Sequence, residues 1–211
     1  MVELVTDRNR IVHSRLLARM FQDRKAIFVD LLKWDLPHDG REERDQFDDR
    51  FAEYLIVTDP ARREHYASLR LLRTERPHVL GSLFARLCDG RVPTGPHIRE
   101  ISRMCLSPRH RGPQRTAYHN LLASAMTEYA LLTGIRAYTG VADMGWMSRV
   151  LSAGWRCEPL GMPRRVDGAT IGAMMIHIEP DTIRRLQASG KYLSGVLNVE
   201  ELEEIEQSVA A

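Results

Sequence analysis

The sequence predicts an α/β sandwich built around a mixed sheet rather than a doubly wound fold. Its segments follow the order helix, strand pair, strand, helix, strand, helix, strand, with a basic loop before the long helix. No G-x-G-x-x-G or Walker segment appears, so a Rossmann-type nucleotide site is not expected. With 211 residues, 44% of them hydrophobic and 27% charged, the chain can bury one full core. We therefore expect residues 1–211 to form a single domain.

Local signals in the first half of the chain predict a helix, a loop and a β-hairpin. The expected elements are a helix from Asp7 or Asn9 to about Phe28, a loop at 36–40, strands at 54–57 and 66–72, and a short helix within 77–87. Asp and Asn accept hydrogen bonds from the first amides of a helix, which favours them as caps. The turn signal Asp59-Pro60 separates two apolar runs and so predicts the hairpin.

The second half of the chain contains the clearest helix. The expected elements are a loop at 90–97, a strand at 98–106, a basic loop at 108–113, a helix through 118–132, a strand at 135–142, a helix at 146–151, a strand at 169–178 and a final helix. Apolar residues at 118, 121, 122, 125, 126, 129 and 132 form one helical stripe, and Gly134 is the expected stop. Asp181 is expected to cap the final helix.

A cation lies on the apolar stripe of the first helix. Arg24 follows the apolar residues 17, 20 and 21 and precedes residue 28 at helical spacing. A guanidinium on a buried face needs carboxylates, and Asp45 and Asp48 are the nearest in sequence. The aromatic residues Phe47 and Phe51 interrupt the same acidic run. This pattern favours a pocket for a charged, ring-bearing small molecule. The alternative is that Arg24 extends outward to solvent and the acidic residues only cap a turn.

Basic residues crowd the segment 99–115, whereas the chain ends in an acidic segment from Glu200. Arg109, Arg111 and Arg115 lie in or next to a glycine-containing loop between a strand and a helix, where a phosphate can be bound. Such a surface suits an acidic protein, a phosphate-bearing ligand or nucleic acid, or it is surface charge alone. Nucleic acid is the weakest of these interpretations, because no aromatic residues interleave with the cations.

The strand before this loop carries a carboxylate. Strict alternation sends Glu100 and Ser102 to one face of the sheet and Arg103 to the other. A carboxylate at the mouth of a sheet can act as a general base toward an amine. The alternative is a surface glutamate paired with a neighbouring arginine.

Methionine and tryptophan residues concentrate in the second half of the chain, at Met126, Met144, Trp146, Met147 and Trp155. They are suited to line an apolar tunnel, although residues of this kind more often form the core.

Other site types are not indicated. The eight histidines and three cysteines show no zinc spacing, and no nucleophile elbow is present, so neither a metal nor covalent catalysis is expected. No run approaches a membrane span, and the first ten residues lack a signal-peptide core. The three scattered cysteines are expected to be reduced, buried thiols, and the protein to be cytoplasmic.

Taken together, these residues resemble the acyl-homoserine-lactone synthases, the LuxI-type autoinducer synthases of bacterial quorum sensing. The resemblance is carried by Arg24, Phe28, Trp34, Asp45, Phe47 and Asp48, then Arg70-Leu71-Leu72 with Thr74 and Pro77, then Phe84, and finally Glu100-Ile101-Ser102-Arg103. It covers most of the chain apart from the C-terminal part.

The resemblance implies a three-layer sandwich like that of the GNAT acyltransferases, with a central, largely antiparallel sheet. It implies acyl transfer from acyl carrier protein or coenzyme A to the amine of S-adenosylmethionine, which is a substrate and not a cofactor. Lactonisation then releases methylthioadenosine. Neither nucleic acid nor membrane insertion is implied.

The resemblance also assigns roles to individual residues. The S-adenosylmethionine site would comprise Arg24, Phe28, Trp34, Asp45, Asp48, Arg70 and Arg103, with Glu100 as the base. The acyl pocket would comprise Phe84, Met126, Trp146 and Met147, and the acyl-carrier contact Arg109, Arg111 and Arg115.

Some positions depart from the family pattern. Arg73 stands where members often have proline, Met104-Cys105 replaces an aromatic and a β-branched residue, and 140–142 lacks a hydroxyl associated with 3-oxo chains. The acyl length and the carrier therefore stay open.

Two other functions remain as alternatives. One is a GNAT-type N-acyltransferase acting on another amine, although the residues 113–115 do not complete its glycine-rich pyrophosphate loop. The other is a non-catalytic sensor of S-adenosylmethionine or acyl groups, which would not need Glu100.

Overall fold

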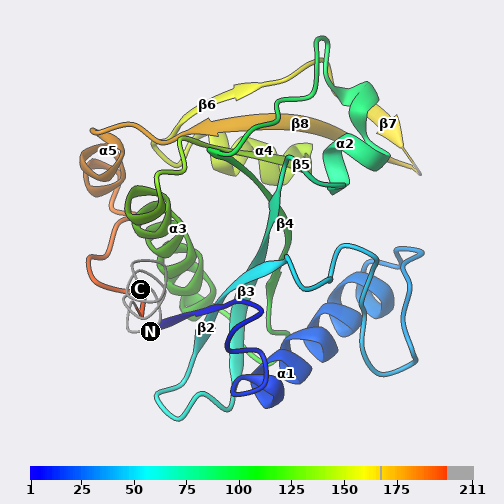
Figure 1. The fold of residues 1–211 in the computed structure, drawn as a ribbon, viewed down its shortest axis with the longest axis vertical. Coiled ribbons are helices and arrows are strands. Elements are labelled where there is room, and N and C mark those ends of the chain that lie inside the picture. Colours follow the sequence, from blue (N-terminus) through cyan, green and yellow to red (C-terminus); the bar gives the residue numbers. More distant parts are fainter. Residues whose placement is uncertain (167, 199–211) are drawn as a thin grey trace, which may run out of the picture.

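A mixed eight-stranded sheet forms the middle layer of the molecule (Figure 1). The computed structural model describes residues 1–166 and 168–198, so the acidic segment from Glu200 lies outside the described residues. The strands are β1 (Val2–Val5), β2 (Glu53–Thr58), β3 (His65–Arg73), β4 (Ile98–Leu106), β5 (Ala137–Asp143), β6 (Arg156–Pro159), β7 (Arg164–Val166) and β8 (Ala169–His177). Their order is β1-β2-β3-β4-β5-β8-β6, and β7 also pairs with β8. Only β4 and β5 run parallel among these pairs, which confirms a mixed, largely antiparallel sheet.

Helices cover both faces of this sheet, which makes three layers (Figure 1). The helices are α1 (Ser14–Arg24), continued by a π-helical segment (Lys25–Leu31), α2 (Val79–Leu83) with a 3₁₀ turn (Ala85–Leu87), α3 (Pro113–Thr133), α4 (Met144–Leu151) and α5 (Thr182–Ala188). α1 and α2 lie on one face, and α3 and α4 on the other. No helix within residues 1–166 and 168–198 is long and apolar enough to cross a membrane.

Several elements agree with the sequence-based expectation. β2 and β3 form the predicted hairpin, and β4 has the predicted bounds. Gly134 ends α3 with a φ of 71°, a left-handed conformation that glycine adopts without a Cβ penalty. The expected helices at 77–87 and 146–151 correspond to α2 with its 3₁₀ turn and to α4.

The N-terminal expectation was wrong. The chain begins with a buried strand, β1, which is too short to show a pattern, and α1 starts only at Ser14. The Asn9 side chain accepts from the Thr6 amide at 2.8 Å and donates to the Leu4 carbonyl at 2.9 Å. Asn9 therefore closes a turn after β1 instead of capping the helix.

Smaller differences occur near the C-terminus. The polar strands β6 and β7 were not predicted, because their mostly exposed residues show no apolar alternation. Asp181 occupies the N-cap position of α5, but its carboxylate accepts from Arg185 at 2.8 Å and makes no cap bond. Of the three thiols, Cys105 is buried, whereas Cys88 and Cys157 are half-buried.

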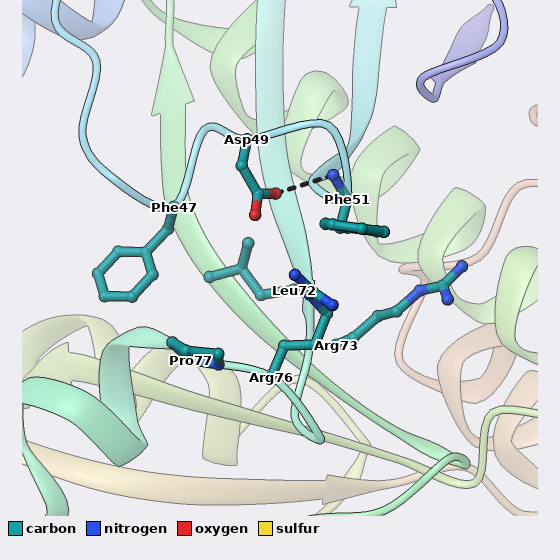
Figure 2. A pocket seen from close by; sticks show the side chains of 7 residues that line it. All are labelled: Phe47, Asp49, Phe51, Leu72, Arg73, Arg76 and Pro77. Atoms are coloured by element: carbon teal, nitrogen blue, oxygen red, sulfur yellow. Dashed lines mark hydrogen bonds between the residues drawn. The ribbon is translucent and has the colours of Figure 1, made fainter.

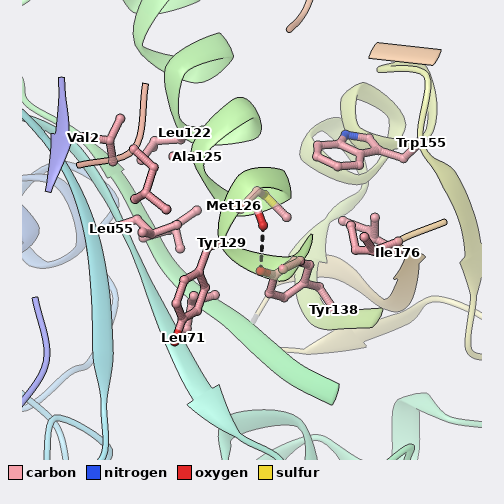
Figure 3. Packing of buried hydrophobic residues seen from close by; sticks show 14 of the residues in the cluster. Val2, Leu55, Leu71, Leu122, Ala125, Met126, Tyr129, Tyr138, Trp155 and Ile176 are labelled. Atoms are coloured by element: carbon pink, nitrogen blue, oxygen red, sulfur yellow. Dashed lines mark hydrogen bonds between the residues drawn. The ribbon is translucent and has the colours of Figure 1, made fainter. Parts of the chain in front are cut away.

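The main core lies between α3 and the sheet (Figure 3). Leu55 and Leu71 point from the sheet toward α3, while Tyr54 and Leu72 point toward α1 and α2, as period-two alternation requires. Two tyrosine hydroxyls in this core are hydrogen-bonded. Tyr138 donates to the Met126 carbonyl at 2.8 Å, and Tyr129 donates to the Glu53 carboxylate at 2.8 Å.

These two hydroxyls predict unequal losses of stability. Tyr138→Phe removes one neutral bond, so the free energy of unfolding should fall by about 1 kcal/mol. Tyr129→Phe removes a bond to a buried carboxylate and should cost about 1.5–3 kcal/mol. Urea unfolding of the two variants side by side measures the difference. Equal losses would mean that Glu53 does not depend on the tyrosine.

Candidate active site

Three arginines and three carboxylates form one ion cluster on the α1 side of the sheet. The cluster comprises Arg24, Arg70, Arg103, Glu43, Asp45 and Asp48. α1 supplies Arg24, β3 supplies Arg70 and β4 supplies Arg103, while the carboxylates come from the loop between α1 and β2. With every member charged, the cluster is electrically neutral.

Arg24 is, with Arg70, one of the two fully enclosed cations of the cluster. Its side chain is 1% exposed, with Nε 2.6 Å from Glu43 and both terminal nitrogens 2.8 Å from Asp48. Burial works against its charge, but the two carboxylates raise its pKa, and Arg24 lowers that of Asp48 in turn. The alternative in which Arg24 extends to solvent is wrong.

Arg70 and Arg103 share Asp45. Arg70 binds it through two nitrogens at 2.6 and 3.1 Å, and Arg103 reaches it at 2.7 Å. Arg103 also contacts Glu43 at 3.1 Å. Asp45 was predicted to pair with Arg24, but Glu43 takes that place. Each carboxylate thus bridges two arginines, which satisfies more of its lone pairs than a single ion pair does.

A β-bulge brings Arg103 to this cluster. Strict alternation predicted the opposite face, but Ser68 pairs with Cys105 while Arg70 pairs with Ser102, so β4 contains one extra residue. Arg103 has a φ of 50°, the left-handed conformation that such a bulge accommodates. Ser102 accepts from Arg70 Nε at 3.0 Å, so Ser102 and Arg103 both serve the same face.

Aromatic rings border the cluster. Phe28, on the π-helical segment, is buried and stacks on Trp34 with centroids 5.1 Å apart and an interplanar angle of 12°. Trp34 is 46% exposed, so one face of this stack is open to solvent. The guanidinium carbon of Arg103 lies 5.7 Å from the Phe28 centroid. A π-helical turn commonly marks a functional site because it changes the direction of side chains.

Glu100 is buried beneath α2. Its carboxylate accepts from the amides of Val79 and Leu80, both at 2.7 Å. Burial raises the pKa of Glu100 to about 7, although these two amides and Arg70 lower it. The alternative of a surface glutamate paired with an arginine is wrong. A carboxyl that titrates near neutral pH is suited to acid–base chemistry.

The predicted acyl-pocket residues are divided between the two faces. Met126 and Met147 are buried in the core on the α3 face, with Trp146 half-buried against it. Phe84 packs with the residues under α1 and α2. The structure therefore does not bring Phe84 together with the other three, and those three are used in packing.

The predicted carrier-contact arginines differ in their surroundings. Arg109 is 44% exposed, but its terminal nitrogens lie 2.7 and 3.0 Å from the buried Asp23 carboxylate. Arg111 is exposed, and Arg115 reaches the His110 carbonyl at 3.5 Å.

A shallow hollow lies next to the loop between α1 and β2 (Figure 2). It is lined by Phe47, Asp49, Phe51, Leu72, Arg73, Arg76 and Pro77. Arg76 covers the Phe51 ring at 3.6 Å, and Asp49 accepts from the Phe51 amide at 2.8 Å. A second hollow is lined by Pro37, His38, Asp39, Glu42 and Arg44. Neither hollow contains a member of the ion cluster. We take the ion cluster as the candidate site because it gathers buried charges beside the Phe28–Trp34 stack. Within residues 1–166 and 168–198, no group of three or more His, Cys, Asp or Glu side chains is placed to hold a metal ion.

Sequence reasoning missed two members of the site. Glu43 lies in the acidic run that contains Asp45 and Asp48, but nothing in its spacing separates it from Glu42, which is only half-buried. Tyr54 donates to Asp48 at 2.8 Å, and its position at the start of a strand gave no signal of this contact.

Comparisons with known proteins identify the family. Residues 7–186 match the family model described as autoinducer synthase. An acyl-homoserine-lactone synthase of Rhizobium etli is 30% identical over 192 residues, which cover 90% of each chain. An isovaleryl-homoserine lactone synthase of Bradyrhizobium diazoefficiens is 29% identical over 186 residues, covering 87% of this chain and 82% of that protein.

Solved structures agree with this assignment. The coenzyme A-dependent acyl-homoserine lactone synthase BjaI, solved with S-adenosylmethionine and isopentyl-coenzyme A, has a TM-score of 0.85 at 26% identity and covers 94% of this chain and 92% of its own. An acyl-coenzyme A N-acyltransferase from Pseudomonas aeruginosa, at 16% identity, has a TM-score of 0.56 over 83% of this chain and 97% of its own, which confirms a GNAT-like fold. The chain therefore belongs to the autoinducer synthase family and is a LuxI-type acyl-homoserine-lactone synthase, an acyltransferase.

Proposed function

We propose that this synthase binds S-adenosylmethionine at the ion cluster and transfers to its amine an acyl group from a thioester. The carboxylate of the methionine moiety then displaces methylthioadenosine and closes the lactone. The observation that carries the proposal is the neutral cluster of three arginines and three carboxylates beside the Phe28–Trp34 stack.

The chemistry of S-adenosylmethionine fits this surface. Its sulfonium and ammonium groups are attracted to carboxylates and aromatic faces, and its carboxylate to a guanidinium. Arg103 is the most exposed arginine of the cluster, with 11% of its side chain accessible, whereas Arg24 and Arg70 are enclosed. We assign the substrate carboxylate to Arg103 and the adenosyl side to the exposed Trp34. Arg24, Arg70 and Asp48 hold the surface in shape, and Asp45 contributes negative charge.

Glu100 is assigned the role of general base. The neutral amine attacks the thioester carbonyl, and its nitrogen gives a proton to Glu100 directly or through a water molecule. The C–S bond then breaks, and the leaving thiolate takes up that proton to depart as the thiol. Burial under α2 makes the carboxylate basic enough for this role, because it raises the pKa of Glu100 to about 7. The competing role is purely structural, as a cap on the first amides of α2.

The acyl donor is assigned to acyl-coenzyme A. BjaI and MesI, described as coenzyme A-dependent synthases, have TM-scores of 0.85 and 0.82. The exposed Arg111, followed by Arg115, supplies positive charge for the donor's phosphates. An acidic acyl carrier protein is the alternative partner for the same cations. We also place the enzyme in the cytoplasm, where its two substrates are made and its thiols stay reduced.

The reaction and its base are tested together. Purified enzyme with S-adenosylmethionine and a panel of acyl thioesters should give acyl-homoserine lactones, detected by mass spectrometry through the homoserine-lactone fragment. Glu100→Gln should lower turnover by about 10²- to 10⁴-fold, because it removes the base, with little change in S-adenosylmethionine affinity. A variant that melts normally and turns over like the wild type would leave Glu100 only its capping role. Absence of any lactone with the full panel would favour the sensor.

The pKa of Glu100 predicts a pH dependence. A base must be deprotonated, so kcat/KM should fall about tenfold per pH unit below about 7 and level off above it. The substrate amine also titrates, so Glu100→Gln provides the control. The inflection near 7 should disappear in that variant and leave only the slope of the amine. Identical profiles for the two enzymes would contradict the assignment.

Charge reversal tests the donor surface. Arg111→Glu with Arg115→Glu should raise the KM for acyl-coenzyme A by about tenfold or more, since two attractive charges become repulsive, and should spare the KM for S-adenosylmethionine. The effect should shrink at high salt. A larger change with acyl carrier protein than with acyl-coenzyme A would reverse the choice of donor.

A further inference from the structure

The basic loop, defined in the structure as residues 107–112 between β4 and α3, is fastened to the interior by Arg109. Its guanidinium makes a two-pronged contact with Asp23, with Nη1 2.7 Å from Oδ1 and Nη2 3.0 Å from Oδ2. It also donates to the carbonyl of His65 at 3.2 Å. Arg109 thus joins the loop to α1 and to β3 at once, while 44% of its side chain stays exposed.

Asp23 is a buried carboxylate near the end of α1. It directly precedes Arg24, an enclosed cation of the ion cluster, on α1. Its Oδ2 also lies 2.6 Å from Nδ1 of His65, whose Nε2 lies 3.0 Å from the Ser68 hydroxyl. Asp23 therefore connects three segments that are far apart in sequence.

Arg109 supplies the positive charge that Asp23 requires. Burial lowers the pKa of His65, which keeps the imidazole neutral at physiological pH. Burial alone would raise the pKa of Asp23, but bonds from His65 and the charge of Arg109 hold it below its usual range, so it is ionised. A buried carboxylate without a cation is strongly unfavourable, so the guanidinium of Arg109 is held against Asp23.

The next residue of the loop is held as well. His110 packs edge-on against Tyr66 and Tyr118, at 4.7 and 5.4 Å between centroids. Those two tyrosines stack on each other at 5.3 Å. With Arg109 and His110 both fixed, the direction in which Arg111 leaves the surface is set by contacts inside the protein.

We propose that Asp23 and Arg109 form a positioning pair that sets the affinity for the acyl donor without contacting either substrate. The pair holds the basic loop against α1, next to Arg24, so the donor surface and the S-adenosylmethionine site keep a fixed relation. This inference rests on the proposed function, because it takes Arg111 and Arg115 as the donor contacts. Arg109, predicted to touch the carrier, is reassigned from contact to support.

Kinetics of a double-mutant cycle test the pair. Asp23→Asn and Arg109→Gln should each raise the KM for acyl-coenzyme A about tenfold. The KM for S-adenosylmethionine should change less than twofold in both variants. The double variant should be no worse than Arg109→Gln, since either change breaks the same contact. Asp181→Asn, which removes a surface carboxylate from Arg185, is the matched control and should leave both KM values unchanged.

Amide hydrogen exchange separates positioning from direct contact. In the absence of donor, Asp23→Asn and Arg109→Gln should both speed exchange across residues 107–112, because the loop loses its attachment. Should Asp23→Asn not fold, Arg109→Gln alone keeps this test, since a residue that only touches the donor would leave exchange unchanged.

Three outcomes would overturn the pair. Unchanged exchange means that the loop is not held by it. A raised donor KM in Arg109→Gln but not in Asp23→Asn means that Arg109 touches the donor itself. Additive effects in the double variant mean that the two residues act separately. Arg111→Glu in the same experiment tests the proposed function separately. An unchanged KM for acyl-coenzyme A in that variant would mean that Arg111 does not contact the donor, and hydrogen exchange would then decide whether Asp23 and Arg109 hold the loop.

Discussion

The buried guanidinium of Arg24 is the constraint on which the rest of the site depends. A charge enclosed to this degree is tolerated only with carboxylates in contact. When α1 packs onto the sheet, the loop between α1 and β2 must therefore bring its carboxylates to Arg24. Glu43 and Asp48 fill that need, and they in turn hold Arg103 and Arg70. Arg24 thus places a loop and two strands, and the proposed substrate surface is formed by the parts of the cluster that remain accessible.

This arrangement uses an irregular backbone where a regular one would fail. In a strand without the bulge, Arg103 would lie on the opposite face from Ser102 and would join the core under α3. The extra residue in β4 reverses that, and the π-helical segment after α1 similarly directs Phe28 toward Arg103. The bulge and the π-helical segment together place Arg103 beside Phe28. This shared result supports a functional role for both irregularities.

Sequence reasoning found the fold and most of the cluster because both depend on local patterns. Apolar periodicity located α3 and the β2–β3 hairpin, and a cation on an apolar stripe indicated that Arg24 needs carboxylates. It could not assign partners, because pairing depends on tertiary register: Glu43 replaced Asp45 next to Arg24. The bulge at Arg103 and the contact of Arg109 with Asp23 likewise cannot be predicted from the spacing of residues in the sequence.

The neutrality of the ion cluster has a consequence for turnover. S-adenosylmethionine arrives with a sulfonium, an ammonium and a carboxylate, each of which a charged cluster can grip. In the proposed reaction the ammonium becomes an amide, and ring closure consumes the sulfonium and the carboxylate together. The lactone and methylthioadenosine, the two products derived from S-adenosylmethionine, therefore leave uncharged, and the three arginines and three carboxylates satisfy one another again. A surface that binds S-adenosylmethionine through its charges, as proposed here, therefore attracts the lactone and methylthioadenosine less strongly than the substrate.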